Sequence, residues 1–197
     1  MVINEQARAI ATLEATPLAV HDKVNILATL AGVKPACSAT LSTSSWHDHE
    51  APLTVPSDDI EQVRHALSLA SLASTVWHYR QSRGSKKQYV VEFFVAKQQQ
   101  VVDQLVSAVH AGDDRKLGHL FGFPKTAVEA YITGTVIPIR ERARSTADVS
   151  EEHMLFLQHM ISQANAEDEV RYLPNYAAHV YALSPTIYNE YVAKRRS

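Results

Sequence analysis

Residues 46–50, WHDHE, place three metal-ligand side chains together, namely His47, Asp48 and His49. Imidazole and carboxylate groups suit zinc or another divalent ion, and alternate residues of an extended segment lie on one side. A mononuclear site needs at least one more ligand, which only folding can supply. The candidates for it are three later histidines, His153, His159 and His179. We therefore expect either a divalent metal site, with His179 as the further ligand, or a solvated polar loop that binds nothing.

Residues 117–131, LGHLFGFPKTAVEAY, have the pattern of two short helices that meet at a tight turn. Gly122 can adopt the positive φ that ends the first helix, and Pro124 can open the second. The apolar side chains that would close the small core between the helices are Phe121, Val128 and Tyr131. The sequence thus predicts a helix-turn-helix-like corner over residues 113–133.

This corner would bind nucleic acid if the second helix presented Lys125 and Thr126 to DNA. That helix has one lysine and no arginine, whereas phosphate contacts usually need several basic side chains. The basic segment that follows holds three candidates for those contacts, Arg140, Arg142 and Arg144. The alternatives are a packing corner without a ligand and a solvated basic loop.

Cys37 is the only cysteine, which excludes an internal disulfide and fits a reducing compartment such as the cytoplasm. A helix N-terminus beside Cys37 would lower the pKa of its thiol and favour nucleophilic catalysis, whereas burial would make the thiol inert. The sequence has no GxSxG elbow, no GxxxxGKS or GxxxxGKT loop and no GxGxxG turn. The usual signatures of serine hydrolases and nucleotide-binding enzymes are therefore missing.

The composition is that of one compact cytoplasmic domain, because 197 residues with 46% hydrophobic content can enclose a core. The formal net charge of -2 gives no global attraction to nucleic acid or to an anionic membrane, so such binding would have to be local. No segment has the roughly 20 apolar residues of a membrane span, and no basic leader precedes an apolar stretch. We expect no membrane partner.

Helical periodicity of apolar residues is the commonest pattern along the chain. It predicts helices over residues 3–13, 20–30, 57–79, 101–110, 151–161 and 187–196. The first two would form an N-terminal helical hairpin within residues 1–35, with Gly32 as the C-cap of the second. Residues 36–56 change to Ser, Thr, His, Asp and Pro, which predicts a mobile loop.

The clearest strand is QYVVEFFV, residues 88–95, because β-branched and aromatic residues dominate it. A single strand cannot satisfy its own backbone, so partner strands must exist. The candidates are three short segments, residues 53–55, 135–139 and 179–183. A small mixed sheet follows as an expectation.

The segments LGHLFGFPKTAVEAY and HVYALSPTIYNEY resemble a poorly characterised prokaryotic domain family. Its members carry a glycine-aromatic-proline-Cys-Cys segment and a later His-x-x-Cys-Ser-Pro-x-Cys segment. The positions that match are Gly122, Phe123, Pro124, His179, Ser184 and Pro185, with His179 one residue too far upstream. The family's cysteines are replaced here by Lys125, Thr126, Leu183 and Ile187. The resemblance therefore implies a shared fold without the family's thiolate site, and a corner that serves packing.

Together these patterns predict a single α+β domain over residues 1–197, mostly helical, with a small mixed sheet. The expected function is binding or regulation without catalysis, with a small ligand or a macromolecule, nucleic acid included, as partner. The alternative is a metal-dependent enzyme that uses His47, Asp48 and His49. The sequence defines neither the ligand nor the oligomeric state.

Overall fold

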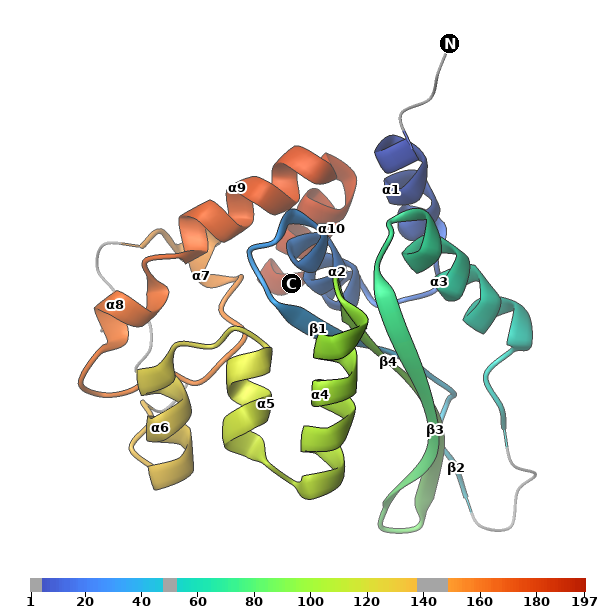
Figure 1. Ribbon diagram of the computed structural model, residues 1–197, viewed down its shortest axis with the longest axis horizontal. Helices are drawn as coiled ribbons and strands as arrows, with labels where there is room; N and C mark the ends of the chain where they lie inside the picture. Colours follow the sequence, from blue (N-terminus) through green and yellow to red (C-terminus); the bar gives the residue numbers. More distant parts are fainter. Residues whose placement is uncertain (1–4, 48–52, 138–148) are drawn as a thin grey trace.

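The structure is a computed structural model that describes residues 5–47, 53–137 and 149–197. Within these ranges the chain forms ten helices and four strands (Figure 1). The strands are β1 (Ala36–Ser42), β2 (Trp46–His47), β3 (Ala73–Arg83) and β4 (Lys86–Ala96). The helices are α1 (Glu5–Ala15), α2 (Val20–Ala31), α3 (Ser57–Leu69), α4 (Gln99–Ala111), α5 (Asp114–Leu120), α6 (Lys125–Thr133), α7 (Glu151–Met154), α8 (Ala166–Val170), α9 (Leu173–Leu183) and α10 (Pro185–Arg196). The expected α+β class, mostly helical with a small sheet, is confirmed.

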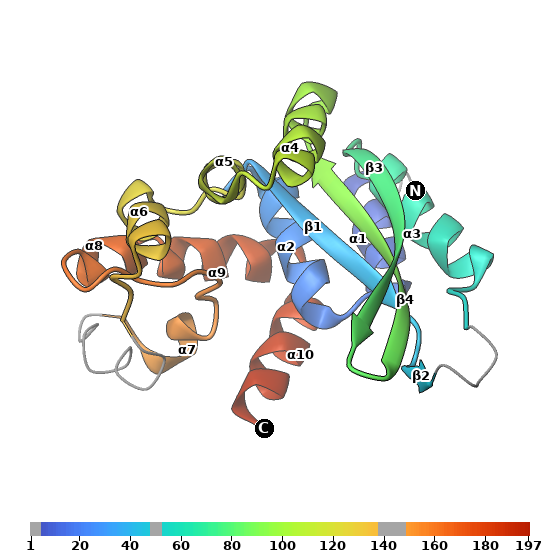
Figure 2. The same ribbon diagram turned by 90° about the horizontal axis from the view of Figure 1, so that it is seen from below.

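The sheet is built around β4, the strand that the sequence predicts most clearly. One edge of β4 pairs with β3, and the other edge pairs with β1 and then with β2. Each of these pairings is antiparallel, whereas the sequence predicts a mixed sheet. β1 is thus an edge strand, and its outer side faces the C-terminal helices (Figure 2).

The two faces of the sheet are buried by different helices because side chains alternate along β4. Val91, Phe93 and Val95 belong to the main core, which α2, α3, α9 and α10 complete. Phe94 and Ala96 point to the opposite face, where α4 covers them. Figure 2 shows α4 on one side of the sheet and α1, α2 and α3 on the other.

The C-terminal helices pack mainly on α2. Both α9 and α10 contact α2, and they also contact each other. Phe156 and Tyr191 are fully buried where these helices meet the segment after α7, with ring centroids 4.9 Å apart. α2 therefore has the sheet on one side and the C-terminal helices on the other.

The predicted corner over residues 113–133 is confirmed as the helix pair α5 and α6. Gly122 has φ +77 in the turn, as expected, and Val128 is buried. Tyr131 was expected to be buried but is 56% exposed. The two helices can approach so closely because residue 118 is glycine, and a Cβ atom there would lie 2.7 Å from Cγ2 of Val128.

The expected loop over residues 36–56 is wrong for residues 36–42 and 46–47, which form β1 and β2. The segment ACSATLS looks like a loop by composition, but Cys37, Ala39 and Leu41 alternate into the core. Its small polar residues occupy the other face of the strand. The composition of the segment therefore gives no sign of the alternation between buried and less buried side chains that the structure shows.

Other expected elements are also corrected. The helix predicted over residues 57–79 ends at Leu69, because Ser71 takes φ +53 and the β-branched segment after it pairs with β4 as β3. Residues 179–183 belong to α9 and not to a strand. Residues 53–55 form no strand, and in the described part of 135–139 only Val136 makes an isolated bridge. The helix expected over 151–161 is limited to α7.

No helix in the described ranges combines the length and apolar character that crossing a bilayer requires.

Candidate functional site

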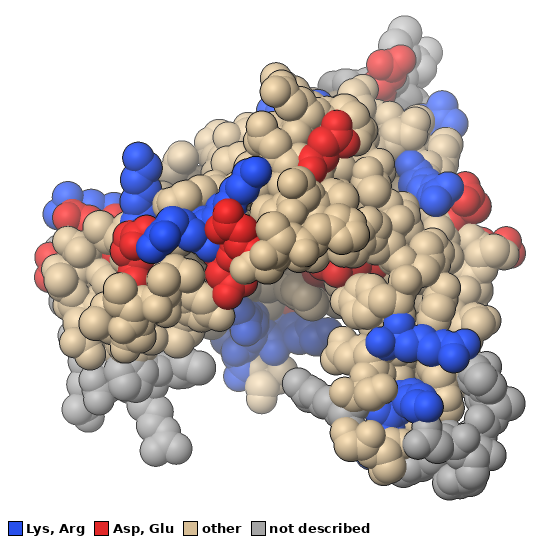
Figure 3. Space-filling model, turned by 60° about the horizontal axis from the view of Figure 1, so that its bottom comes forward, with Lys and Arg blue, Asp and Glu red and all other residues tan. Residues whose placement is uncertain are grey.

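The main candidate site is a cleft of about 620 Å³ between the edge of β1 and the C-terminal helices. This volume is in the range of small-molecule sites. The cleft is lined by α2, the bend before β1, the start of β1, the α5–α6 turn, Gln158 and α10. On the face shown in Figure 3, the surface is hollowed near the middle, with blue basic side chains at the lower edge of the hollow.

Lys34 is the most unusual side chain of this cleft, because it is a buried amine. After the C-cap Gly32, the backbone N–H groups of Val33 and Lys34 both donate to the carbonyl of Ala28, which folds the bend back over the end of α2. Lys34 is only 9% exposed as a result. Burial lowers the pKa of its ammonium group from 10.5 to about 8.

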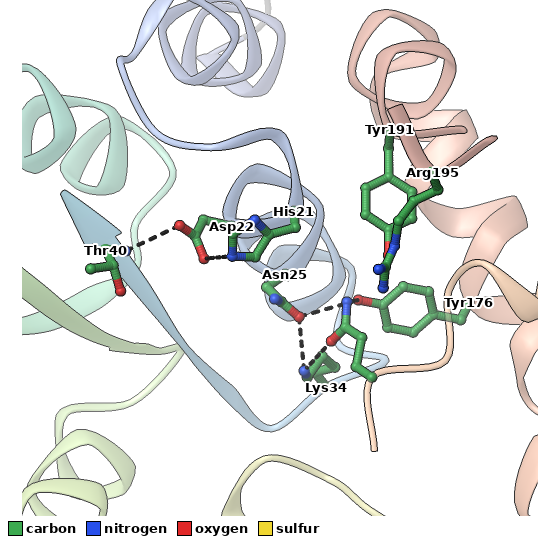
Figure 4. A network of polar contacts seen from close by, with 9 residues as sticks. His21, Asp22, Asn25, Lys34, Thr40, Tyr176, Tyr191 and Arg195 are labelled. Carbon is green, nitrogen blue, oxygen red and sulfur yellow. Dashed lines mark hydrogen bonds and ion pairs between the residues drawn. The ribbon is translucent and has the colours of Figure 1, made fainter. Parts of the chain in front are cut away.

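The hydrogen-bond partners of Lys34 are neutral amides. Its Nζ donates to Oδ1 of Asn25 and to Oε1 of Gln158, each at 2.8 Å (Figure 4). Nε2 of Gln158 in turn donates to the hydroxyl of Tyr176 at 3.2 Å. These bonds hold both amides with an oxygen toward the ammonium group. They satisfy two of its three N–H groups and leave its charge without a carboxylate in the described part of the chain.

Arg195 contributes a second positive charge from α10. Its Nε donates to the hydroxyl of Tyr191 at 3.2 Å, and that hydroxyl donates to the carbonyl of Leu155 at 2.8 Å. The guanidinium group also lies 5.5 Å from the centroid of the Tyr191 ring. In Figure 4 the Arg195 side chain extends toward the group formed by Lys34, Asn25 and Tyr176. The contacts with Tyr191 thus orient the Arg195 side chain toward the cleft.

His21 lines the cleft beside β1, and it contacts the buried carboxylate of Asp22, which is not itself part of the lining. Oδ2 of Asp22 accepts a hydrogen bond of 3.2 Å from the backbone N–H of Thr40, and Oδ1 lies 3.0 Å from Nε2 of His21. Asp22 is 4% exposed, so it closes the open edge of β1 with a buried carboxylate. The hydrogen bond with Asp22 raises the pKa of His21, while the charges of Arg195 and Lys194 oppose that rise.

The charge of the cleft is therefore positive. Four of its lining side chains can carry a positive charge, namely His21, Lys34, Lys194 and Arg195. No aspartate or glutamate is among the described residues that line it. Such a lining suits an anion of the size of a carboxylate or phosphate group.

Cys37 also lines the cleft but does not fit nucleophilic catalysis. The thiol is 1% exposed and lies within β1, not at a helix N-terminus. Burial raises its pKa to about 11, so the thiol is protonated at neutral pH. Of the two interpretations drawn from the sequence, the buried and inert thiol is the one that fits.

The residues of the expected metal site are not brought together in the part of the chain that can be described. Asp48 and His49 lie outside the described residues, and for His47 only the backbone is placed, opposite Lys86 in β2. His179 is exposed on α9, and both ribbon views place α9 on the other side of the molecule from β2. Within the described ranges no three His, Cys, Asp or Glu side chains are grouped as metal ligands. His179 as a further ligand to the loop of His47 is therefore not supported.

The expected nucleic-acid residues are only partly placed. Lys125 and Thr126 are exposed at the start of α6, as the hypothesis requires. Arg140, Arg142 and Arg144 lie outside the described residues. Elsewhere on the corner, Arg115 and Glu129 neutralise each other through two hydrogen bonds of 2.7 and 2.9 Å. The described surface of α5 and α6 thus adds little basic charge to Lys125.

Sequence reasoning missed the residues that make the cleft. Lys34 stands between a helix C-cap and Pro35, and only the rarity of a lysine flanked by apolar residues in such a bend could have marked it. Arg195 is explained equally well as a cation at a helix C-terminus. Asn25 and Gln158 show no local pattern, because their role depends on contacts with Lys34, which lies 9 positions from Asn25 and 124 positions from Gln158.

Comparison with known proteins gives no matching family model, no matching curated protein and no matching solved structure. The resemblance of the C-terminal half to a cysteine-containing family therefore stays a prediction, and the function must be argued from the cleft itself.

Proposed function

We propose that this protein binds a small anionic ligand in the cleft beside Lys34 and acts as a binding or regulatory protein. The observation that carries the proposal is the environment of the Lys34 ammonium group. It is buried and hydrogen-bonded to two neutral amides, and no described carboxylate pairs with it. A buried charge of this kind is costly unless a counter-charge joins it.

A bound anion would supply that counter-charge. The third N–H group of Lys34 and the guanidinium group of Arg195 would donate charge-assisted hydrogen bonds to its oxygen atoms. Lys194 would add long-range attraction at the rim, whereas the charge of a protonated His21 is largely offset by the carboxylate of Asp22. Recognition needs no bond to be made or broken, which is why binding without catalysis is the simplest function of this arrangement.

The test is isothermal titration calorimetry with sodium acetate and inorganic phosphate at pH 7, for the unmodified protein and three variants. Lys34→Met and Arg195→Gln should each weaken binding of the better probe by about tenfold or more, because a hydrogen bond to a charged group contributes roughly 1.5–3 kcal/mol. Lys125→Met, which removes an exposed lysine outside the cleft, should have no effect.

Arg195 is exposed, so its replacement does not threaten folding, and thermal unfolding would identify a Lys34→Met variant that has lost its fold. Equal affinity in the Lys125, Lys34 and Arg195 variants would overturn the proposal, since binding would then be a property of the surface as a whole.

A further inference from the structure

A second cavity of about 550 Å³ adjoins the cleft, between the α5–α6 corner and residues 157–160. Its lining is mostly apolar, with Leu117, Phe121, Phe123, Ala127, Val128, Tyr131, Leu157 and Met160. Four residues line both cavities, namely Phe121, Phe123, Gln158 and Arg195. The cationic cleft and the apolar cavity are therefore neighbours that share a wall of aromatic rings and the Arg195 side chain.

The shared wall is held in place by ring contacts. Phe123 stacks on His159 with centroids 5.3 Å apart and meets Phe121 at 6.0 Å. Nζ of Lys34 lies 5.5 Å from the centroid of the Phe123 ring, so one face of this wall also supports the ammonium group. A ligand held by Lys34 would thus be in contact with an apolar surface that continues into the second cavity.

The two cavities differ in charge. Lys34, His21 and Lys194 line only the first cavity, and Asp114 is the one carboxylate among the described residues of the second. An anionic group is therefore favoured in the first cavity over the second, where the charges of Arg195 and Asp114 offset each other. The second cavity suits the part of a ligand that carries no charge.

We propose that the ligand is an anionic amphiphile, a monocarboxylate with a single apolar chain. Its carboxylate would lie between Lys34 and Arg195, and its chain would run past Phe121 and Phe123 into the cavity of the α5–α6 corner. This inference rests on the proposed function and adds the class of ligand. It also gives the corner a role, since the corner forms a wall of the cavity for the chain.

The unexpected exposure of Tyr131 agrees with this arrangement. Tyr131 is 56% exposed, although it belongs to the lining of the second cavity. An aromatic ring at such a position loses contact with water when a chain enters, and this favours binding.

The experiment is a calorimetric titration with butanoate, hexanoate and octanoate at pH 7, each below its micelle concentration, with octylammonium as the probe of opposite charge. Affinity should rise by up to about fourfold for each methylene group that becomes fully buried. Octylammonium should bind at least tenfold more weakly than octanoate. Lys34→Met should weaken binding of each carboxylate by a similar factor.

Substitutions of two exposed tyrosines test where the apolar chain of the ligand binds. Tyr131→Ser should reduce octanoate affinity by about threefold or more and leave butanoate affinity unchanged. Tyr181→Ser is the matched control, because Tyr181 is 52% exposed on α9 and lines neither cavity. Both substitutions are at exposed positions, so neither threatens the fold.

The outcomes separate the two proposals. If affinity does not change with chain length but falls in Lys34→Met, the proposal of an amphiphilic ligand is overturned and the proposal of anion binding stands. A gain with chain length that Tyr131→Ser leaves unchanged also overturns it, since the chain would lie elsewhere. Equal binding of octanoate and octylammonium, unaffected by Lys34→Met, overturns the proposed function itself.

Discussion

Gly122 lies directly against Pro35, so that a Cβ atom on Gly122 would lie 2.6 Å from Cδ of Pro35. The two residues belong to different segments that contribute to the cleft, because Gly122 lies between the lining residues Phe121 and Phe123 and Pro35 directly follows Lys34. Glycine also meets the backbone requirement at this turn, where φ is +77. This contact fixes the distance between the corner and the Lys34 bend.

We predict that Gly122→Ala destabilises the protein by more than the strain of a positive φ alone. That strain costs about 1–3 kcal/mol, and the contact with Pro35 adds to it. The control is Gly134→Ala, because Gly134 has φ +73 and no atom within 4 Å of its added Cβ. Urea unfolding of both variants measures the difference. Equal decreases in the free energy of unfolding would mean that Pro35 moves aside without a measurable loss of stability, which would contradict the prediction.

A second glycine tests the packing of the corner. We predict that Gly118→Ala is destabilising even though alanine is the better helix former by about 1 kcal/mol, because its methyl group would overlap Val128. In the background of Val128→Ala the same substitution should be much less harmful, with a coupling free energy of about 1 kcal/mol or more. A double-mutant cycle of urea unfolding measures this, and additive effects would argue against the close approach of α5 and α6.

The lowered pKa of Lys34 predicts a dependence of stability on pH. The folded protein releases the Lys34 proton near pH 8, whereas the unfolded chain keeps it to about 10.5, so the unfolded state binds more protons between these values. Titration of Lys34 therefore raises the free energy of unfolding as pH rises through this window, by an amount on the order of 3 kcal/mol.

Lys34→Met isolates this effect, because other buried groups titrate nearby. The raised pKa of Cys37, about 11, lowers stability in both proteins as pH rises above its ordinary value of 9.0. The loss is larger in Lys34→Met, because the charge of Lys34 lowers the pKa of the Cys37 thiol, so this coupling acts in the same direction as the titration of Lys34. From pH 8 to pH 10.5 the free energy of unfolding of the unmodified protein should thus rise relative to that of Lys34→Met. A difference that is constant with pH would contradict a lowered pKa.

Asp22 should control both the edge of β1 and the titration of His21. We predict that Asp22→Asn lowers the pKa of His21, because the bond to the carboxylate is the main cause of its raised value. The amide oxygen of asparagine can still accept from the N–H of Thr40, so the fold should survive. The NMR titration of the His21 ring measures this, with His65 as an internal reference. A His21 pKa that does not change would exclude the Asp22 contact in solution.

The sequence predicts local features well and contacts between distant residues poorly. Gly122 and Gly32 are recognisable because a positive φ leaves a local signature, and both have the conformation expected of them. β1 escapes detection because Ser38, Thr40 and Ser42 make it look like a loop, and pairing with β4 decides its conformation. The cleft could not be predicted from local sequence for the same reason, since only the folded chain brings Asn25 and Gln158 to the ammonium group of Lys34.

The charged amine of Lys34 is the centre of this account, and its pKa in the presence of ligand is the most direct test. Heteronuclear NMR of the lysine side chains, assigned with Lys34→Met, gives this pKa with and without saturating octanoate. We predict a value of about 8 in the free protein and a clear rise when the carboxylate is bound, because an adjacent anion stabilises the charged form. A pKa near 10.5 that octanoate leaves unchanged would contradict both the burial of the amine and its role in binding.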